Sequence, residues 1–429
     1  MSVARQYLRG VSALLDLFPS NSAVDPDGTL TIGGCRADAL AEEFGTPVMV
    51  VDELALRARA REYVDELTAR WPKGRVVFAS KAFPATAVQR VMVEEGLGLD
   101  VAGGGEILTA LKAGVDPALI VLHGNAKSDD DIDLAVEHGL GLVVVDNGDD
   151  VDRLEARVPS GATQDVLVRV IPGVNADTHS AVLTGHEGSK FGLMPRDAAA
   201  LITRIETSPR LSMQGLHVHV GSQILDAEPF ADSVEPLAKL GEFPVYDLGG
   251  GLGARYTWSD RPPTVAAYLD ALIGAAKQHL PGEAQVIVEP GRSMVAAQAA
   301  TLYRVTTVKR GSTRFVAVDG GMGDNLEVAL YDQRFEAGIV GRFDGPDPEH
   351  VTVVGRHCES GDVLIDGIDL SAPAVGDLLA MPATGAYCYT MGNNYNGSRR
   401  IPVVFARDGA ARLVIRRETW DDLMARDVD

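Results

Sequence analysis

The chain has 429 residues, three cysteines and a formal net charge of −21. This length predicts two domains, and three cysteines are too few and odd in number for a disulfide framework. The negative field repels phosphate backbones and anionic lipids, so neither nucleic acid nor a membrane is an expected partner. The apolar stretch Tyr7–Phe18 is interrupted by Arg9 and Asp16, which argues against a signal peptide. We therefore expect a cytoplasmic protein that acts on a small molecule.

Short apolar, β-branched runs alternate with helical periodicity through the middle of the chain. The runs are Val76–Ser80, Leu97–Val101, Leu119–Leu122, Gly141–Val145, Val166–Ile171, Leu216–Val220, Pro244–Leu248 and Val286–Val288. The helical stretches include Ala87–Glu95, Glu106–Ala113, Asp130–His138 and Ala266–His279. This alternation predicts an α/β fold with a closed parallel (β/α)8 barrel of the TIM type over residues 45–296.

The pattern changes after about residue 300, where short strands are separated by turns. They are Thr301–Val308, Arg314–Val318, Val351–Val354, Leu378–Met381, Val403–Ala406 and Arg412–Ile415. Consecutive strands without intervening helices are typical of antiparallel sheets. We therefore predict a C-terminal antiparallel β domain formed by residues 297–429 and joined by residues 1–44.

Polar and glycine residues gather directly after the predicted barrel strands. In chain order they are Lys81, Asp100, His123, His219, Gly221, Ser222, Gly249–Gly253 and Glu289. The carboxyl ends of all strands in such a barrel open on one face, where active sites are built. The sequence therefore predicts an active site at this face.

Lys81 follows an apolar strand, so its amine is expected at the mouth of the barrel. Partial desolvation there would favour reaction with a carbonyl cofactor. A lysine that merely reaches solvent from a strand end is the alternative. The glycine-rich turn at Gly249–Gly253 could hold a phosphate on its backbone N–H groups, and its place late in the barrel matches the usual barrel phosphate site. Many such turns, however, are only tight loops.

Glu289 ends the eighth strand and precedes Arg292 by three residues. A carboxylate paired with a pyridine nitrogen keeps that nitrogen protonated and so makes the ring an electron sink. The alternative is a surface ion pair. His217 and His219 alternate with apolar residues and face the same side of their strand. Because no third ligand has a suitable spacing, we expect no metal, and His219 is instead expected to stack on a planar cofactor.

Two motifs of the predicted β domain could also carry chemistry. Cys358 and Glu359 lie in a loop, where the thiol could donate a proton or simply pack as a small apolar group. Tyr387 belongs to an apparent strand, Ala386–Tyr389, whose tyrosines would share one face.

Together these motifs resemble the diaminopimelate/ornithine decarboxylase family, which has the alanine-racemase fold, and most closely its diaminopimelate decarboxylases. The resemblance runs from Gly45 to Thr419. The motifs that carry it occur in the family's order and are the Lys81 segment, Asp100–Glu106, His217–Gln223, Gly249–Gly253, Glu289–Arg292, Cys358–Asp362 and Gly385–Tyr387.

The resemblance implies a pyridoxal 5'-phosphate enzyme in which Lys81 carries the cofactor as a Schiff base. His219 would stack on the pyridine ring and Glu289 would hold its nitrogen. The remaining cofactor ligands implied are Asp100, Ser222, Gly250, Gly251, Gly291, Arg292 and Tyr387. The substrate ligands implied are Arg292, Glu327, Tyr331, Asp332, Glu359 and Tyr387.

The same resemblance implies a homodimer with shared active sites, because Cys358 and Glu359 would reach into the neighbouring subunit. The leading reaction converts meso-diaminopimelate to L-lysine and CO2 through an external aldimine and a quinonoid. Cys358 or Lys81 would return the proton. A racemase on the same fold is an alternative that Glu289 disfavours, and an inactive homologue is disfavoured by the presence of Lys81 and Cys358.

One segment departs from the family's pattern. Diaminopimelate decarboxylases usually have an arginine where this chain has Glu327, and a glycine where it has Asp332. Leu330-Tyr331-Asp332 resembles ornithine decarboxylases instead. A carboxylate in place of a guanidinium favours a substrate with a cationic tail, so another diamino acid or a specialised amino acid is an alternative substrate. Arg334 could otherwise take over the missing charge.

Overall fold

The computed structural model describes residues 14–173, 188–343, 345 and 347–428. The chain divides into two compact units: a barrel unit of residues 57–253 and 261–294, and a β unit of residues 1–56, 254–260 and 295–429. The stretch Tyr7–Phe18 lies partly outside the described residues. No helix among the described residues is both long and apolar enough to cross a membrane.

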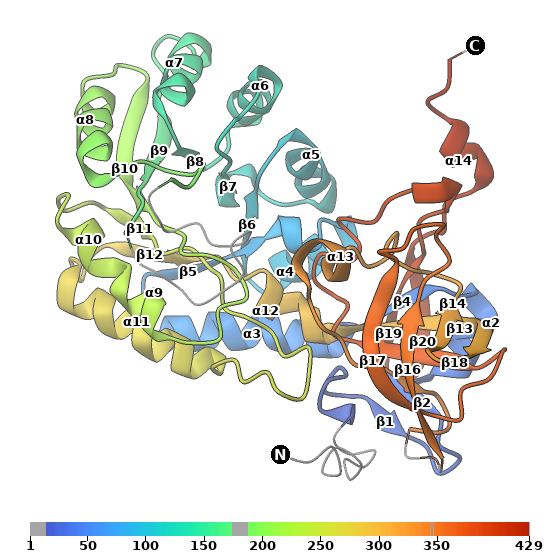
Figure 1. Ribbon diagram of the computed structural model, residues 1–429. Helices are drawn as coiled ribbons and strands as arrows, with labels where there is room; N and C mark the ends of the chain where they lie inside the picture. The colour runs from blue at the N-terminus through green and yellow to red at the C-terminus, as the bar shows by residue number, and fades with distance from the viewer. Residues whose placement is uncertain (1–13, 174–187, 344, 346, 429) are drawn as a thin grey trace. The chain divides into compact units, whose positions relative to one another are not determined.

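The barrel unit confirms the predicted parallel barrel. Its strands follow one another in sequence order around the barrel and close by pairing of the last with the first (Figure 1). They are β5 (Gly74–Ala79), β6 (Gly98–Val101), β7 (Ile120–Leu122), β8 (Leu142–Val145), β9 (Gln164–Arg169), β10 (Leu211–His217), β11 (Val245–Asp247) and β12 (Gln285–Val288).

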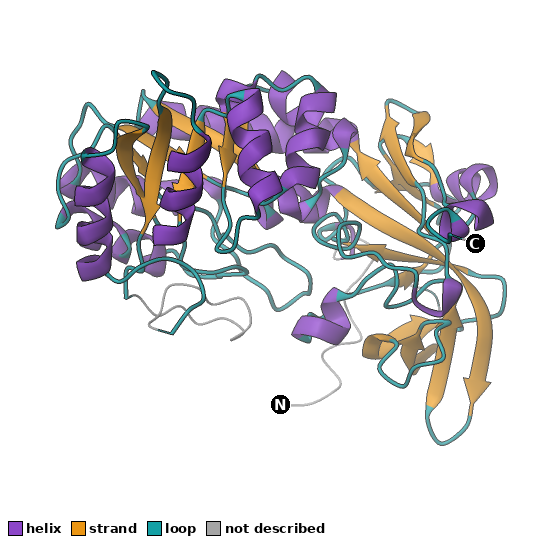
Figure 2. Cartoon of the chain, turned by 90° about the horizontal axis from the view of Figure 1, so that it is seen from above, coloured by secondary structure: helices purple, strands orange, loops and turns teal. Residues whose placement is uncertain are grey.

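Helices precede and follow these strands and surround them on the outside (Figure 2). They are α3 (Glu53–Arg70), α4 (Thr86–Glu94), α5 (Gly104–Ala113), α6 (Asp129–His138), α7 (Gly148–Arg157), α8 (Pro195–Glu206), α9 (Glu228–Asp232), α10 (Val234–Ala238), α11 (Val265–His279) and α12 (Arg292–Val295). Ser128 caps the start of α6 and Asn147 that of α7, because each side chain accepts a backbone N–H that the helix leaves without a partner.

The interior of the barrel is a packed apolar core. Its members come from almost every strand and are Val77, Val121, Leu142, Val144, Leu167, Val245 and Ile287. All are less than a tenth exposed. Because this core fills the interior, polar chemistry is confined to the strand ends.

The β unit is built around a nine-stranded sheet that is mixed and not purely antiparallel. The strands are β4 (Val48–Asp52), β13 (Ala299–Arg310), β14 (Arg314–Val318), β15 (Gly338–Ile339), β16 (Pro348–Val354), β17 (Val363–Ser371), β18 (Leu378–Pro382), β19 (Val403–Arg407) and β20 (Ala410–Ile415). β14 pairs with β16 and β4 pairs with β19 in parallel. Neither pair is joined by a hairpin: α13 (Glu327–Tyr331) lies within the β14–β16 connection, which is long enough for a crossover.

The N-terminal segment packs into the core of the β unit. It contributes the small sheet β1 (Ala23–Val24), β2 (Leu30–Ile32) and β3 (Cys35–Arg36), followed by α2 (Ala37–Phe44). Leu30, Ile32 and Leu40 are buried in the same cluster as Leu302 and Val404 of the large sheet. The last helix of the unit is α14 (Trp420–Met424).

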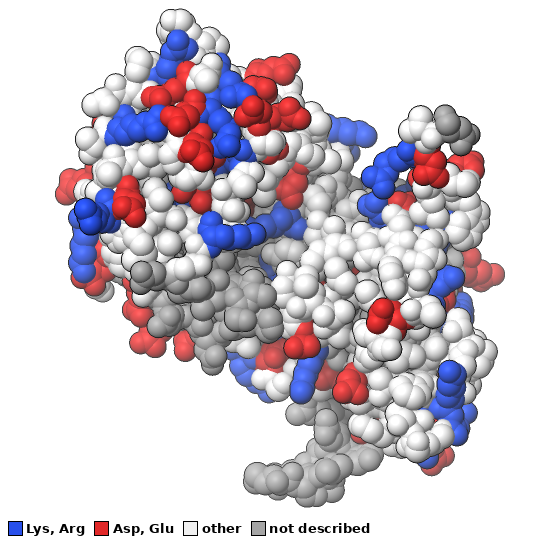
Figure 3. All heavy atoms as spheres, turned by 45° about the horizontal axis from the view of Figure 1, so that its top comes forward, with Lys and Arg blue, Asp and Glu red and all other residues white. Residues whose placement is uncertain are grey.

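Charged side chains of both signs are mixed on the surface (Figure 3), although the net charge is negative. Lys and Arg are interspersed with Asp and Glu over the barrel helices in Figure 3. Arg157 pairs with Asp129 and Asp133 of α6, and Arg204 of α8 pairs with Asp152 of α7. Such exposed pairs contribute little stability singly, so the outer surface does not determine the geometry of the strand ends.

Gly215 offers a test of the barrel's pairing. It follows a bulge in β10, and a Cβ at this position would lie 1.7 Å from the carbonyl oxygen of Val245 in β11. We expect Gly215→Ala to lower the free energy of unfolding by about 2–3 kcal/mol or more, because the strands must separate. Urea unfolding of the purified protein measures this change.

Gly274 in α11 provides the matched control. A Cβ there would contact nothing within 4 Å. Alanine stabilises a helix relative to glycine, so Gly274→Ala is expected to raise the free energy of unfolding by about 0.5–1 kcal/mol. Equal effects of the two substitutions would contradict the close approach of β10 and β11.

Candidate active site

The first group of predicted site residues meets at the ends of β5 and β6. Lys81 lies in the short turn Ser80–Ala82 after β5, and its Nζ is 4.0 Å from Oδ2 of Asp100 in β6. The Lys81 side chain is 45% exposed, whereas that of Asp100 is 2% exposed. The amine therefore reaches the surface of the barrel mouth while a buried carboxylate lies beneath it.

Glu289 is the centre of a buried cluster at the end of β12. Its Oε1 lies 2.9 Å from Nε2 of His123 and 3.4 Å from Nε2 of His217. Its Oε2 lies 3.7 Å from Nδ1 of His219. Nε2 of His123 is also 3.7 Å from Oδ1 of Asp100, so the cluster is continuous with the Lys81 group. Lys81 and Glu289 thus belong to one arrangement of strand-end side chains.

Two histidines of this cluster, His217 and His219, are neutral at neutral pH. Burial lowers the pKa of His217 to about 3 and that of His219 to about 4. Nδ1 of His219 accepts a hydrogen bond from the backbone N–H of Gly250 at 3.2 Å, which requires an unprotonated nitrogen. A neutral His219 can lie against an aromatic ring without placing a second charge there.

Glu289 is ionised despite its burial. Burial alone disfavours the carboxylate, but the imidazoles of His123 and His217 outweigh it and hold the pKa of Glu289 well below its usual value. Asp247 behaves in the opposite way, since burial and the nearby Glu289 charge raise its pKa well above the usual range. The pKa values of the two neighbouring carboxyls are therefore shifted in opposite directions, so Glu289 carries a negative charge more readily than Asp247.

The donor atoms of His123, His217 and Glu289 all lie within 4.8 Å of one another, a spacing that could hold a metal ion. Sequence spacing did not identify this third group, because the ends of β7 and β12, which carry His123 and Glu289, come next to His217 only on barrel closure. The same atoms have a second use. Both imidazoles approach the same oxygen of Glu289, which orients that carboxylate and leaves its other oxygen toward His219.

A cradle for an anion lies beside this cluster. The Arg292 guanidinium is 6% exposed, and its Nε donates to the hydroxyl of Ser222 at 3.3 Å. The glycine turn packs tightly next to it: a Cβ on Gly250 would lie 2.0 Å from the carbonyl of Glu289, and one on Gly251 would lie 2.3 Å from that of Gly221. Only glycine fits at these two positions, and the bare backbone suits close approach of a phosphate.

These features match what pyridoxal phosphate needs from a protein. The amine of Lys81 can bind its aldehyde, the ionised Glu289 can pair with its ring nitrogen, and the Ser222–Arg292 cradle can take its phosphate. Gly291 fits the same description, since a Cβ there would lie 3.0 Å from Ala79. The fold and these residues together define a cofactor-dependent barrel enzyme.

The predicted site residues of the β unit occupy two loops and one short helix. Cys358 is exposed in a loop, and its backbone N–H donates to Oδ1 of Asn396 at 2.7 Å. Glu359 accepts a hydrogen bond from the hydroxyl of Tyr395 at 3.4 Å. Tyr387 lies in a turn with φ 63°, so the predicted strand at Ala386–Tyr389 was wrong. The turn packs closely against the backbone at Val295: a Cβ at Gly385 would lie 1.9 Å from the carbonyl of Val295.

Glu327 and its neighbours lie on α13. Glu327 begins this helix, is fully buried and accepts a hydrogen bond from the hydroxyl of Tyr256 at 3.3 Å. Tyr331 ends the helix, and Asp332 caps it in the left-handed conformation at φ 53°. Asp332 occupies a position that glycine would adopt more easily.

Three residues of the barrel site had no role in the sequence prediction. His123 was noted only as a residue after a strand, and neither Asp247 nor Arg169 was assigned a role. Arg169 ends β9, is 8% exposed and lies 3.9 Å from Asp146. Their common signal is a polar side chain at the carboxyl end of a barrel strand, and that rule alone would have found all three.

Comparisons with known proteins agree with this site. A family model described as the pyridoxal-binding domain of pyridoxal-dependent decarboxylases matches residues 55–296. The chain is 41% identical to a diaminopimelate decarboxylase of Bacillus subtilis over 94% of this chain and 95% of that protein. It is 43% identical to one of Actinosynnema pretiosum over 94% and 93%.

Solved structures show the same relationship. The diaminopimelate decarboxylase of M. jannaschii superposes with a TM-score of 0.89 at 30% identity, covering 96% of this chain and 98% of that one. That of Helicobacter pylori, in complex with L-lysine, gives 0.85 at 27% identity over 90% and 98%. The protein is thus a pyridoxal-phosphate-dependent carboxy-lyase. It belongs to the diaminopimelate decarboxylase family.

The opposite pKa shifts of Glu289 and Asp247 can be tested by isosteric amides. Asp247→Asn should leave cofactor affinity and decarboxylation close to those of the native protein, because an amide mimics the neutral acid that the raised pKa favours and still accepts the N–H of Gly249. Glu289→Gln should lower kcat by about 10²-fold, because the site then loses its fixed negative charge. Steady-state rates at saturating cofactor measure both. A comparable loss in the two variants would show that Asp247 is also charged.

Proposed function

We propose that the protein decarboxylates diaminopimelate to give lysine and CO2. Support comes from the names of its relatives, which are 41% and 43% identical over nearly the whole chain. The observation that carries the proposal is the continuity of Lys81, Asp100, His123 and Glu289 at one end of the barrel. In the reaction, the bond from the substrate's Cα to its carboxylate breaks, CO2 leaves and Cα gains a proton.

The bound cofactor supplies an electron-withdrawing ring that takes up the electron pair of the broken bond. The chain's own residues prepare for that step. Glu289 keeps a negative charge that favours a protonated ring nitrogen, and neutral His219 provides a flat face without charge. Arg292 and Ser222, which are hydrogen-bonded to each other, would hold the anionic end of the cofactor. Lys81 presents a half-exposed amine that can bind the cofactor and return a proton.

A second candidate substrate class is an amino acid with a cationic tail, such as ornithine or lysine. It is favoured by Glu327, a fully buried carboxylate at the start of α13 where the family usually has an arginine. A carboxylate would repel the second carboxylate of diaminopimelate and attract a terminal amine. The two candidates differ only in the substrate and share the same chemical step.

A panel of amino acids distinguishes these candidates. Purified protein with added cofactor is incubated with meso-diaminopimelate, L-ornithine, L-lysine and their D-isomers, and CO2 release is measured. We expect release from meso-diaminopimelate and none from the Lys81→Ala variant, which lacks the amine. Preference for ornithine or lysine would favour the interpretation that Glu327 attracts the cationic tail of the substrate. Loss of optical activity without CO2 release would indicate a racemase.

We also propose a homodimer whose active sites are shared, with Cys358 and Glu359 acting in the site of the partner. Support comes from the family resemblance and from the exposure of Cys358; the two other cysteines, Cys35 and Cys388, are buried. A chain with only three cysteines fits a reducing compartment, so we propose a cytoplasmic location.

Mixing two inactive variants tests the shared site. Lys81→Ala and Cys358→Ala chains are co-expressed with different tags, and the mixed dimer is purified. If one subunit supplies the lysine and the other the cysteine, one of two sites in each mixed dimer is intact. The purified mixed dimer should then regain about half of native activity. Absence of any recovery in a stable mixed dimer would place both residues in the same chain's site.

A further inference from the structure

We propose that Lys127 is a positioning residue that fixes the loop carrying His123 and thereby orients Glu289. The inference rests on the cofactor site proposed above and assigns part of its geometry to a residue that does not take part in the chemistry. Lys127 lies between β7 and α6, and its side chain is fully buried. A buried ammonium is costly unless its protons are bonded, so its partners decide what it does.

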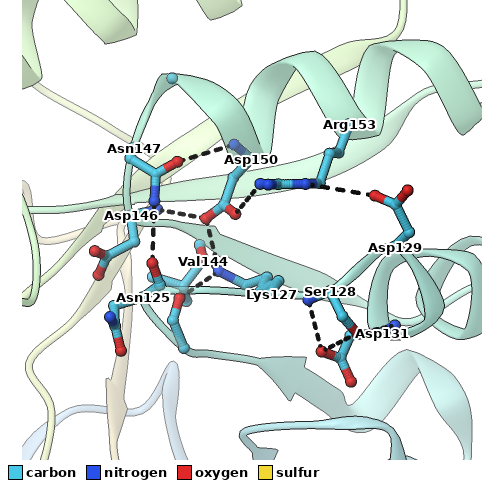
Figure 4. A network of polar contacts seen from close by, with 12 residues as sticks. Asn125, Lys127, Ser128, Asp129, Asp131, Val144, Asp146, Asn147, Asp150 and Arg153 are labelled. Carbon is cyan, nitrogen blue, oxygen red and sulfur yellow. Dashed lines mark hydrogen bonds and ion pairs between the residues drawn. The ribbon is translucent and has the colours of Figure 1, made fainter.

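All three protons of the Lys127 ammonium have acceptors. Nζ donates to the carbonyl of Gly124 at 2.7 Å, to the carbonyl of Val144 at 2.6 Å and to Oδ2 of Asp150 at 2.9 Å (Figure 4). These acceptors belong to the β7–α6 loop, to β8 and to the first turn of α7. One amine therefore ties together two consecutive barrel segments just beyond the β7–β8 ladder, whose last paired residues are Leu122 and Val143.

The hydrogen bond from Lys127 acts on Gly124, the residue next to His123. Gly124 follows His123 and has a φ of 115°, a conformation in which its carbonyl turns toward Lys127. On the N-terminal side of His123, its own backbone N–H donates to the carbonyl of Val101 at 2.8 Å. His123 is thus held from both sides, and its Nε2 lies 2.9 Å from Glu289. A shift of Gly124 would move that imidazole.

Hydrogen bonds of the same kind extend to the neighbouring loops. Asn147, the cap of α7, donates from its side chain to the carbonyl of Asn125 at 3.2 Å, and Asp146 N–H donates to Asp150 at 3.1 Å (Figure 4). Oδ1 of Asp146 accepts the N–H of Gly192 at 3.0 Å and lies 3.9 Å from Arg169. Lys127 is the only cation among the described residues that bridges the β7 and β8 ends in this network.

A purely structural role would make a different prediction. Replacement of a buried ion pair by apolar groups is often neutral for stability, so the Lys127–Asp150 pair is not needed for the barrel to fold. An apolar pair cannot, however, donate hydrogen bonds to the carbonyls of Gly124 and Val144. The double variant Lys127→Met/Asp150→Leu removes both charges and so leaves no unpaired buried carboxylate.

The test compares this double variant with Arg153→Met. Arg153 contacts Asp150 at 3.7 Å and Asp129 at 3.5 Å on the outer side of the same network, without reaching the β7–α6 loop (Figure 4). Urea unfolding, cofactor dissociation constant, kcat, KM and deuterium exchange of residues 122–128 are measured for each. We expect the double variant to unfold near the native urea concentration, with kcat lowered about 10²-fold at nearly constant KM.

The same variant should bind cofactor more weakly and exchange faster at residues 122–128, whereas Arg153→Met should match the native protein in all five measurements. A folded double variant with native kcat and native exchange would overturn the proposal. So would a double variant that does not fold, because Lys127 would then be required for folding itself. If the native protein bound no cofactor, the proposed function would fail, while the exchange data would still decide whether Lys127 fixes the loop.

Discussion

The charge on Glu289 is the constraint on which the rest of the site depends. A carboxylate that is 3% exposed is expensive to ionise, and its pKa would rise without nearby groups that favour the charged form. His123 and His217 supply them by approaching the same oxygen. Burial and the Glu289 charge raise the pKa of Asp247, which disfavours a second negative charge beside Glu289. Each of these residues comes from a different strand. The barrel must therefore close correctly before the carboxylate can hold its charge.

Much of this arrangement follows from the order of residues along the chain. Alternating apolar runs and helical stretches define the barrel, and the rule that chemistry lies at the strand ends selects Lys81, Asp100, His219 and Glu289. Protonation states could not be predicted in this way. Glu289 and Asp247 are both acidic residues at strand ends, yet the histidine contacts lower the pKa of Glu289, whereas burial and the Glu289 charge raise that of Asp247. His123 acquires its role only because β7 and β12 lie around the same barrel.

Strand pairing in the β unit was harder to predict from the sequence, because its strands pair with partners far away along the chain. Period-two patterns located most strands but not their directions, so the parallel pairs β14–β16 and β4–β19 were missed. Tyr387 shows the same limit locally. Its apolar neighbours are typical of a strand, yet close packing of Gly385 against Val295 bends the chain into a turn with a left-handed tyrosine. Tertiary packing overrides local propensity at such positions.

The two compact units carry different parts of the proposed function. Lys81, His219 and Glu289 belong to the barrel unit, where Glu289 contacts the histidines of the cluster. Glu327 begins α13 in the β unit and accepts a hydrogen bond from Tyr256 of the same unit. Under the proposed function, a charge reversal at Glu327 would change which amino acid is accepted, because a carboxylate attracts an amine and repels a second carboxylate. The bond that breaks would stay the same.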